Sequence, residues 1–290
     1  MIEKRYHRTK DSYTISRFLF YIIYFLFFVI ICNPFLYSQS DLGYVGARSK
    51  AMGKTGLTVN DAWSVFNNPA AMSDSDKASL GIFYENRFLL RETGFGAIAF
   101  ATPLLNGNLG VGVTHFGFEL FQRNRVSVGY SLKLSRFLSM GINVNYFSVR
   151  QSDFYSNFNV VNFELGVLTR INEKFSIAAR IFNPLNFSYF ENDDLKMPVS
   201  IELGFSYLFS KSLLLAIETG KAINEKIPVF KSGIEYNINQ YFDFRIGLSL
   251  VPLEYTFGIG YKIHGFGFDM AFIYHQILGI TPNISINYEF

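Results

Sequence analysis

From Ala78 to the C-terminus the chain alternates between apolar and polar residues with a period of two. Between 126 and 135, for example, every even position holds Val, Tyr or Leu, and every odd position holds Ser, Gly or Lys. This period is typical of β-strands that have one apolar and one polar face. The pattern predicts about fourteen strands, near 78–87, 92–104, 108–118, 123–135, 137–150, 159–171, 174–185, 197–209, 212–222, 228–239, 241–251, 254–263, 265–275 and 280–290.

The connections between these strands fall into two classes that alternate along the chain. Bacterial membrane barrels have an even number of antiparallel strands, short periplasmic turns and longer external loops, whereas a soluble sandwich has no reason to follow this rule. The sequence therefore predicts an all-β fold, a transmembrane antiparallel barrel over 78–290. Short connections at 105–107, 135–136, 172–174, 210–211, 239–240 and 264–265 alternate with longer ones at 86–92, 117–124, 151–158, 186–196, 221–227 and 276–279.

The alternation alone does not say which face of the barrel looks outward, because a soluble barrel with an apolar interior has the same period. The volume of the side chains decides which face looks outward. The apolar faces carry Phe, Tyr, Leu and Ile on nearly every strand, and these side chains are too large to fit together in one interior. The polar faces hold mostly Gly, Ser, Asn and Thr, with single charges that a wet or mutually paired lumen tolerates. The predicted inward charges are Glu164, Glu202, Glu218, Glu235, Asp243, Asp269, Glu289, Lys133, Arg170, Arg180, Arg245 and Lys262.

The N-terminus has the features of a secretory signal peptide. Five basic residues lie within 1–17, and an apolar run follows over 18–31. Small residues at 38 and 40 predict cleavage before Asp41, which removes 1–40. The alternative is an uncleaved anchor, but the run is shorter than the ~20 residues that a spanning helix needs.

Removal of this segment changes the charge and the available chemistry. The whole chain has 26 basic and 23 acidic residues, and cleavage removes five basic and two acidic ones, which leaves 21 of each. The mature chain therefore has no excess of basic residues that would favour binding to nucleic acid. Aromatic residues make up 18% and charged residues 17%, too aromatic and too weakly charged for an average soluble domain. Cys32, the only cysteine, leaves with the signal peptide, and as a lipoprotein acceptor it lacks the small residue expected before it. The mature chain therefore forms no internal disulfide.

The mature sequence contains no recognisable catalytic or metal-binding motif. His115, His264 and His275 fall on separate predicted strands or turns and lack metal-ligand spacing. Serine is spread over the polar faces without a nucleophile elbow, and the glycines in 94–96 and 258–260 have strand spacing. We therefore expect a non-enzymatic protein without a cofactor or a metal.

Aromatic residues at two places suggest contacts with other molecules. The chain ends on Tyr288, Glu289 and Phe290, which resembles the C-terminal insertion signal of Gram-negative outer-membrane proteins. The resemblance implies recognition by the barrel assembly machinery and a final place in outer-membrane lipid. In the predicted external loop 186–196, Phe187, Tyr189 and Phe190 precede acidic residues. Most such aromatics belong to an interfacial girdle, and the sharper hypothesis is that these three contact a partner or a hydrophobic ligand.

Residues 46–72 are the part of the mature chain that does not alternate. The segment is rich in small residues, contains the only tryptophan, Trp63, and closes on Asn67-Asn68-Pro69-Ala70. Proline and asparagine favour a turn or a helix stop over a continuing strand. A segment of this kind lies outside a closed barrel or fills it.

The motifs of this segment resemble those of a known family. Gly46-Ala47-Arg48, Ala51-Met52-Gly53, Asn60-Asp61-Ala62-Trp63 and Asn68-Pro69-Ala70 are similar to the N-terminal signature of the PorV/PorQ family, within the FadL-like superfamily. In that superfamily a small N-terminal hatch that ends in an Asn-Pro-Ala turn precedes a fourteen-stranded barrel. The resemblance implies a hatch or plug over 41–77, with motif residues Arg48, Gly53, Asp61, Trp63, Asn68 and Pro69.

We expect this hatch to fold into the periplasmic mouth or the lumen of the barrel. Trp63 would pack inside, and Pro69 would end the segment before the first strand. Arg48, Lys50, Lys54 and Asp61 are candidates to pair with the inward charges of the barrel wall.

The resemblance implies two functions, of which the first is our main prediction. PorV/PorQ proteins are outer-membrane components of type IX secretion that engage secreted cargo or secretion-system components at the cell surface. FadL relatives instead let hydrophobic small molecules pass, which requires an apolar inner pocket. The predicted lumen of Gly, Ser, Asn and paired charges weighs against the FadL alternative, although the hatch and the upper barrel could still line a pocket. A purely structural barrel is the third alternative.

Overall fold

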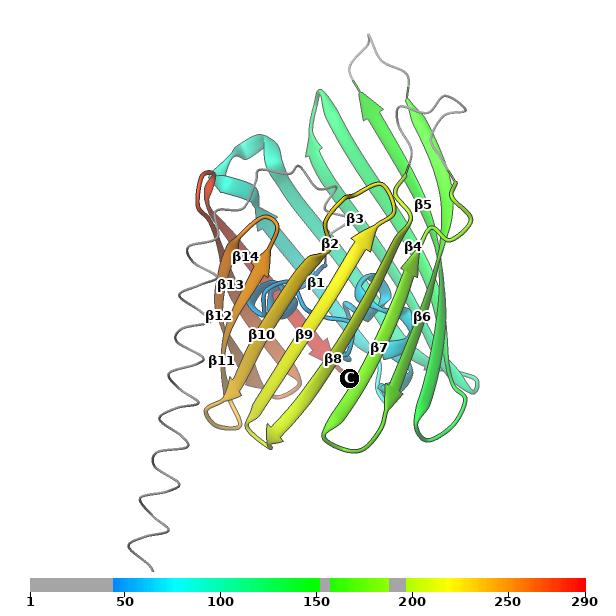
Figure 1. Cartoon of the computed structure of the whole chain (residues 1–290), viewed down its shortest axis with the longest axis vertical. Coiled ribbons are helices and arrows are strands. Elements are labelled where there is room, and N and C mark those ends of the chain that lie inside the picture. The colour runs from blue at the N-terminus through cyan, green and yellow to red at the C-terminus, as the bar shows by residue number, and fades with distance from the viewer. Residues whose placement is uncertain (1–43, 152–156, 188–196) are drawn as a thin grey trace, which may run out of the picture. The chain divides into compact units, whose positions relative to one another are not determined.

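The computed structural model describes residues 44–151, 157–187 and 197–290, and these form a closed antiparallel β-barrel (Figure 1). The strands follow one another around the barrel in chain order, and β1 closes the ring against β14. They are β1 (Ser79–Asn86), β2 (Gly94–Leu104), β3 (Gly107–Phe118), β4 (Phe121–Lys133), β5 (Leu138–Gln151), β6 (Phe158–Arg170), β7 (Phe175–Phe182), β8 (Ser200–Ser210), β9 (Leu213–Ala222), β10 (Val229–Asn237), β11 (Phe242–Leu250), β12 (Glu254–Ile263), β13 (Phe266–His275) and β14 (Gly279–Glu289).

The predicted fold class is confirmed, because each observed strand corresponds to a predicted one. The two kinds of connection also separate in space: the short turns gather at the end of the barrel where the C-terminus lies, and the longer connections at the opposite end (Figure 1). We call these the short-turn end and the long-loop end. The longer connection between β1 and β2 contains two 3₁₀-helices, η2 (Arg87–Leu89) and η3 (Arg91–Thr93).

The largest difference from the prediction lies between the seventh and eighth strands, predicted over 174–185 and 197–209. The structure ends β7 at Phe182 and begins β8 at Ser200. Asn183 adopts a left-handed φ of 54°, and its side-chain amide donates to the carbonyl oxygens of Phe187 and Met197. These bonds turn the chain out of the ladder before the predicted end of the strand.

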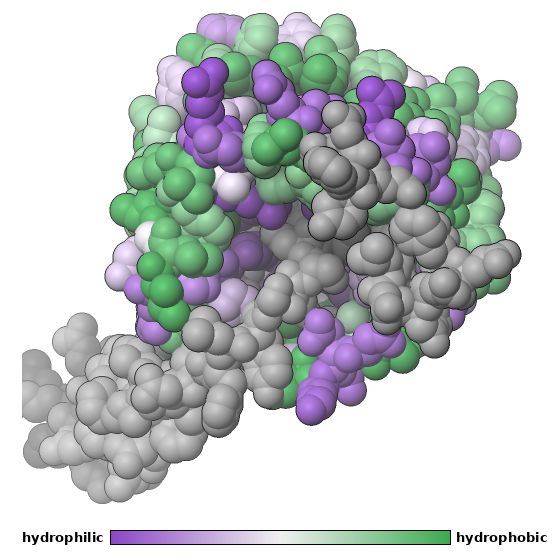
Figure 2. Space-filling view, turned by 90° about the horizontal axis from the view of Figure 1, so that it is seen from above, coloured by the Kyte–Doolittle hydropathy of each residue, from purple (hydrophilic) through white to green (hydrophobic). Residues whose placement is uncertain are grey.

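The two faces of the wall are divided as the alternation predicts. Ile82, Ile98 and Ile286 stand side by side on neighbouring strands and are 53%, 54% and 40% exposed on the outer face. Figure 2, a view into the barrel from above, shows a largely hydrophobic exterior around a hollow in which hydrophilic residues are visible. An outward apolar band and a polar interior are the arrangement of membrane barrels.

The barrel encloses the described part of the hatch, residues 44–77. It contains two short helices, α2 (Ala47–Ala51) and α3 (Ser64–Asn67), and the 3₁₀-helix η1 (Pro69–Asp74). Figure 1 shows these helices in blue inside the ring of strands. Hydrophobic residues of the segment, such as Met52, Leu57 and Phe66, are completely buried. No helix in the described part of the chain is long and apolar enough to cross a membrane.

Inward-facing glycines let the hatch approach the wall closely. A Cβ atom on Gly141 of β5 would overlap the backbone of Pro69, and one on Gly247 of β11 would overlap the backbone of Met52 and Gly53. Only a residue without a side chain fits where two backbones meet in this way. Since β5 and β11 lie in different parts of the ring, the hatch rests against the wall on more than one side.

Candidate functional site

Four charged side chains of the hatch pair with inward charges of the barrel wall. The partners belong to β1, β4, β6, β10 and β12, so the pairs hold the hatch at several points around its circumference. Removal of one partner of a buried pair leaves an uncompensated charge, which is strongly destabilising. The pairs are Arg48 with Glu235 at 2.6 Å, Lys50 with Glu85 at 2.9 Å, Lys54 with Glu254 at 2.5 Å, and Asp74 with both Arg170 and Lys133.

Asp61, the remaining charged candidate of the hatch, makes no ion pair with the wall among the described residues. Its Oδ1 atom accepts the backbone N–H of Trp63 at 2.9 Å, and its Oδ2 atom is buried without a partner in the described part of the chain. Burial raises the pKa of Asp61 to about 6, although the charge of Arg48 opposes this shift. The hatch therefore holds a carboxyl group that changes charge in mildly acidic solution.

Glu218 of β9 is a wall residue that binds two separate parts of the hatch. Its Oε1 atom accepts the backbone N–H groups of Gly56 and Leu57, both at 2.7 Å. Its Oε2 atom accepts the hydroxyl of Tyr44, also at 2.7 Å. The strand alternation predicted an inward Glu218 but no partner for it, because these contacts join residues more than 160 positions apart in sequence.

The other predicted motif residues of the hatch make structural contacts. Gly53 has a left-handed φ of 68°, and its N–H donates to Thr256. Trp63 is fully buried and meets Phe83 of β1 edge to face, with 5.9 Å between ring centroids. Asn68 donates to the carbonyl oxygen of Leu57 at 2.7 Å and accepts from the N–H of Ala70.

Pro69 does not end the hatch, which corrects the sequence prediction. It is the first residue of η1, which continues to Asp74 before β1 begins at Ser79. Proline suits this position because the first turn of a helix needs no N–H from it and its fixed φ is already helical. A helix does end just before the proline, because the last residue of α3 is Asn67.

Arg245 of β11 is the centre of a charged cluster in the lumen near the short-turn end. Its guanidinium contacts Glu235, Asp243 and Asp269 at 2.6, 3.0 and 2.6 Å. Arg48 of the hatch shares Glu235 with it. These inward positions agree with the predicted lumen charges, and their mutual pairing explains how the barrel tolerates them.

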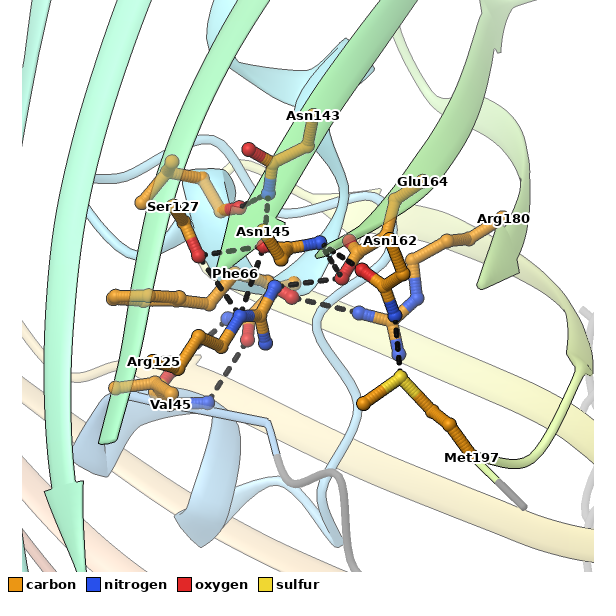
Figure 3. Close-up of polar contacts among 12 residues, drawn as sticks. Val45, Phe66, Arg125, Ser127, Asn143, Asn145, Asn162, Glu164, Arg180 and Met197 are labelled. Atoms are coloured by element: carbon orange, nitrogen blue, oxygen red, sulfur yellow. Dashed lines mark hydrogen bonds and ion pairs between the residues drawn. The ribbon is translucent and has the colours of Figure 1, made fainter. Parts of the chain in front are cut away.

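A second polar cluster lies on the opposite part of the wall, on β4 to β7, and we call it the polar floor. Arg125 donates from Nη2 to Glu164 at 2.6 Å and from Nε to Ser127 and Asn145. Figure 3 shows that these side chains converge on one place beside Phe66 of the hatch. The polar floor consists of Arg125, Ser127, Asn143, Asn145, Asn162, Glu164 and Arg180.

Apolar side chains continue the same inward faces from the polar floor toward the long-loop end. On β5 the inward sequence runs Asn143, Asn145, Phe147, Val149, and all four residues are buried. Phe147 meets Phe182 of β7 edge to face at 6.2 Å, and the Arg125 guanidinium lies 5.5 Å from the Phe147 ring centroid. We call this surface the aromatic wall; it consists of Phe147, Val149, Phe158, Val160, Phe182 and Met197.

The aromatic wall adds an apolar part to a lumen that is otherwise lined, as predicted, mainly by Gly, Ser, Asn and charges. Toward the long-loop end, the inward faces of β5, β6 and β7 become apolar. Inward phenylalanines also occur on β1 and β2, where the rings of Phe83 and Phe95 meet at 5.9 Å. The signal was present in the sequence, because Phe147 and Val149 keep the same odd positions as the polar residues before them.

The predicted terminal and loop residues lie apart from this site. Tyr288 packs on Phe266 at 4.5 Å and on Phe290 at 4.9 Å, at the short-turn end of the outer surface. Phe187 is 39% exposed, and its N–H donates to Asn183. Tyr189 and Phe190 lie outside the described residues, so contact with a partner or ligand stays a prediction.

His115, His264 and His275, the histidines in the described ranges, do not form a common site. His115 bonds to Asn124 at 2.7 Å, and His275 accepts two backbone N–H groups after β13. Within the described ranges, no group of three or more His, Cys, Asp or Glu side chains is arranged to hold a metal ion.

Comparisons with known proteins find similar solved structures, whereas comparisons of sequence find no match. No protein-family model and no curated protein matches the chain. Among solved structures, the CymD monoaromatic hydrocarbon channel covers 87% of this chain and 99% of its own, with a TM-score of 0.69 and 14% identity. The Pseudomonas putida toluene transporter TodX covers 86% and 99%, with a TM-score of 0.64 and 14% identity. A Pseudomonas aeruginosa FadL homologue covers 89% and 100%, with a TM-score of 0.58 and 12% identity.

These similarities extend over nearly the whole length of the described barrel and hatch. At 12 to 14% identity they show a shared fold. In this fold the non-alternating segment of the chain precedes the fourteen strands of the barrel.

Proposed function

We propose that the protein is an outer-membrane channel that admits small hydrophobic molecules, with aromatic hydrocarbons as its favoured class. The apolar exterior of the barrel supports the membrane location. The shared fold with monoaromatic hydrocarbon channels supports the class of activity by analogy. This proposal favours the FadL alternative over the main prediction from sequence.

The observation that carries the proposal is the aromatic wall above the hatch. Phe147, Phe182 and Met197 form an apolar cluster on the inward side, which a water-filled barrel has no reason to contain. Ligand pockets are mostly apolar with a few polar groups that fix orientation. An aromatic wall that adjoins a polar floor has this composition.

In the proposed channel, the hatch blocks the lumen along the barrel axis. Ion pairs to five strands and the close approach at Gly141 and Gly247 hold it in the lumen. Ions and large polar solutes therefore have no wide aqueous path along the barrel.

Uptake of radiolabelled toluene tests the proposal. A Gram-negative host without its own hydrocarbon channels is given the wild-type protein, the double variant Phe147→Ala/Phe182→Ala, or the control Phe244→Ala. Phe244 is a phenylalanine of the lipid-facing surface, 43% exposed. We expect faster uptake with wild type and the control, and a loss of most of the gain with the double variant. Equal uptake with and without the wild-type protein would reject the channel function.

The PorV/PorQ interpretation of the hatch motifs stays a separate hypothesis. No specific contact of the described residues favours a secreted cargo or a type IX component. Deletion of the gene distinguishes the two functions: a secretion role requires impaired export or surface retention of specific proteins with normal uptake of hydrophobic compounds, and the channel function requires the opposite.

A further inference from the structure

Glu164 supplies a buried hydrogen-bond acceptor that the described chain leaves unused. Its Oε1 atom accepts from Arg125 and Asn145, whereas its Oε2 atom has no partner among 44–151, 157–187 and 197–290. The side chain is 0% exposed. Buried polar atoms in folded proteins are nearly always paired, so this oxygen can accept a donor from a water or a ligand.

A second unpartnered acceptor of the polar floor has a different environment. The Oδ1 atom of Asn143 is also buried without a partner in the described residues, but it lies against Gly129 of the neighbouring strand β4. It therefore faces the wall. Glu164 is the acceptor of the floor that adjoins aromatic side chains.

The position of Glu164 in the sheet places it beside these rings. Glu164 of β6 stands directly opposite Phe182 of β7, and both side chains are buried on the inward face. Residues opposite each other in an antiparallel pair have Cβ atoms ~5 Å apart. Phe182 in turn meets Phe147 edge to face at 6.2 Å. We call Glu164, Phe147 and Phe182 the acceptor corner.

The carboxylate is held in a fixed orientation before any ligand arrives. Arg125 reaches it with a charge-assisted bond of 2.6 Å, and Asn145 bonds to the same oxygen at 3.1 Å while also bonding to Asn162. A preorganised acceptor costs a ligand less ordering entropy than a mobile one. The network around Oε1 therefore leaves Oε2 in place to accept a hydrogen bond (Figure 3).

We propose that the acceptor corner selects aromatic molecules that carry one hydrogen-bond donor, such as phenols and anilines, over the corresponding hydrocarbons. The inference rests on the proposed function and narrows its substrate class. The aromatic ring packs on Phe147 and Phe182, and the hydroxyl or amino group donates to Oε2 of Glu164. An aromatic carboxylate is disfavoured, because it would bring a second negative charge to this oxygen.

The test compares p-cresol with p-xylene, which differ by a hydroxyl in place of a methyl group. Binding to the purified full-length protein in detergent is measured by equilibrium dialysis, with protein-free micelles as the partition control. A hydrogen bond to a charged acceptor strengthens binding by roughly tenfold to a hundredfold, so p-cresol is expected to bind at least about tenfold more tightly. Binding of both compounds with equal affinity would overturn the inference and leave the channel function intact. Binding of neither would reject both.

The variant Glu164→Gln tests the role of the oxygen itself. Its amide oxygen can keep the bonds to Arg125 and Asn145, which turns the amino group toward the ligand as a donor. We expect Glu164→Gln to bind p-cresol about as tightly as it binds p-xylene. We also expect 4-methylbenzaldehyde, which can only accept a hydrogen bond, to bind this variant more tightly than it binds wild type.

Glu218→Gln is the matched control, because Glu218 is another buried lumen glutamate whose oxygens are all occupied by the hatch. It is expected to keep the wild-type preference for p-cresol. Loss of the preference in both variants would show that it depends on general lumen charge and would overturn the inference. If Glu164→Gln fails to fold, the comparison of p-cresol with p-xylene on wild type still decides.

Discussion

The Tyr44 hydroxyl donates to Glu218 at 2.7 Å across 174 positions of sequence, and the same carboxylate accepts two backbone N–H groups of the hatch. One wall residue thus fixes the beginning of the hatch and its middle. Because Glu218 is 2% exposed, these three donors have no access to water in its place. These three bonds therefore hold the hatch from a buried position in the lumen.

Replacement of Glu218 by alanine should loosen the hatch and leave the barrel intact. The substitution strands the Tyr44 hydroxyl and the N–H groups of Gly56 and Leu57, and each buried unpaired donor costs about 1–3 kcal/mol. We expect faster hydrogen exchange at residues 44–74, with unchanged exchange in the strands. Glu218→Gln keeps an acceptor oxygen and should have a smaller effect. Wild-type protection of the hatch in Glu218→Ala would show that other contacts suffice.

A single methyl group at Gly247 should disturb the hatch more than the same group at Gly267. The Cβ of alanine at 247 would overlap the backbone of Met52 and Gly53, whereas at Gly267, another inward-facing position, the nearest atom is 3.9 Å away. We expect Gly247→Ala to raise the conductance of the protein in planar lipid bilayers and Gly267→Ala to leave it unchanged. Equal conductance of the two variants would mean that the hatch adapts to the added group.

Strand number, strand order and the outward face were predictable because a membrane barrel gives each strand two contrasting environments. Ile82 and Ile286 face outward and Gly81 and Ser285 inward for the same reason, and a period of two records it directly in the sequence. The hatch was also detectable, since its residues break this period. The early end of β7 was not, because it depends on how the Asn183 amide bonds to the backbone of Met197.

The contacts of the candidate site were beyond the sequence pattern. Lys50 was a candidate for pairing, but its partner Glu85 was not among the predicted inward charges, and Arg125 was absent from them as well. Strand periodicity gives the direction of a side chain, whereas its partner depends on strand register and on how the hatch sits. The apolar lining was missed for another reason: averaging a face along its length hides the change from Asn145 to Phe147.

The C-terminal residue should matter for assembly as well as for closure of the barrel. The N–H of Phe290 donates to the carbonyl oxygen of Ala78 at 3.0 Å, which extends the pairing of β14 with β1. Removal of Phe290 loses this bond and the edge-to-face contact with Tyr288. We expect a reduced yield of folded barrel, measured by heat-modifiable mobility in gels, with Phe290→Tyr close to wild type. A normal yield after deletion would contradict a role in insertion.

Acidification should stabilise the hatch through Asp61. Its pKa is raised from 3.8 to about 6, chiefly by burial, so the folded hatch binds this proton more tightly than the unfolded segment does. The contribution of Asp61 to the free energy of unfolding the hatch should therefore rise as pH falls from 7 to 4, by up to about 3 kcal/mol. Trp63 is the only tryptophan of the chain, so tryptophan fluorescence reports on the hatch. The urea midpoint is measured from this fluorescence at pH 7.5 and pH 4.5. Asp61→Asn, which stays neutral at both values, should show a smaller difference between the two midpoints; an equal difference in both proteins would assign the pH dependence to other groups.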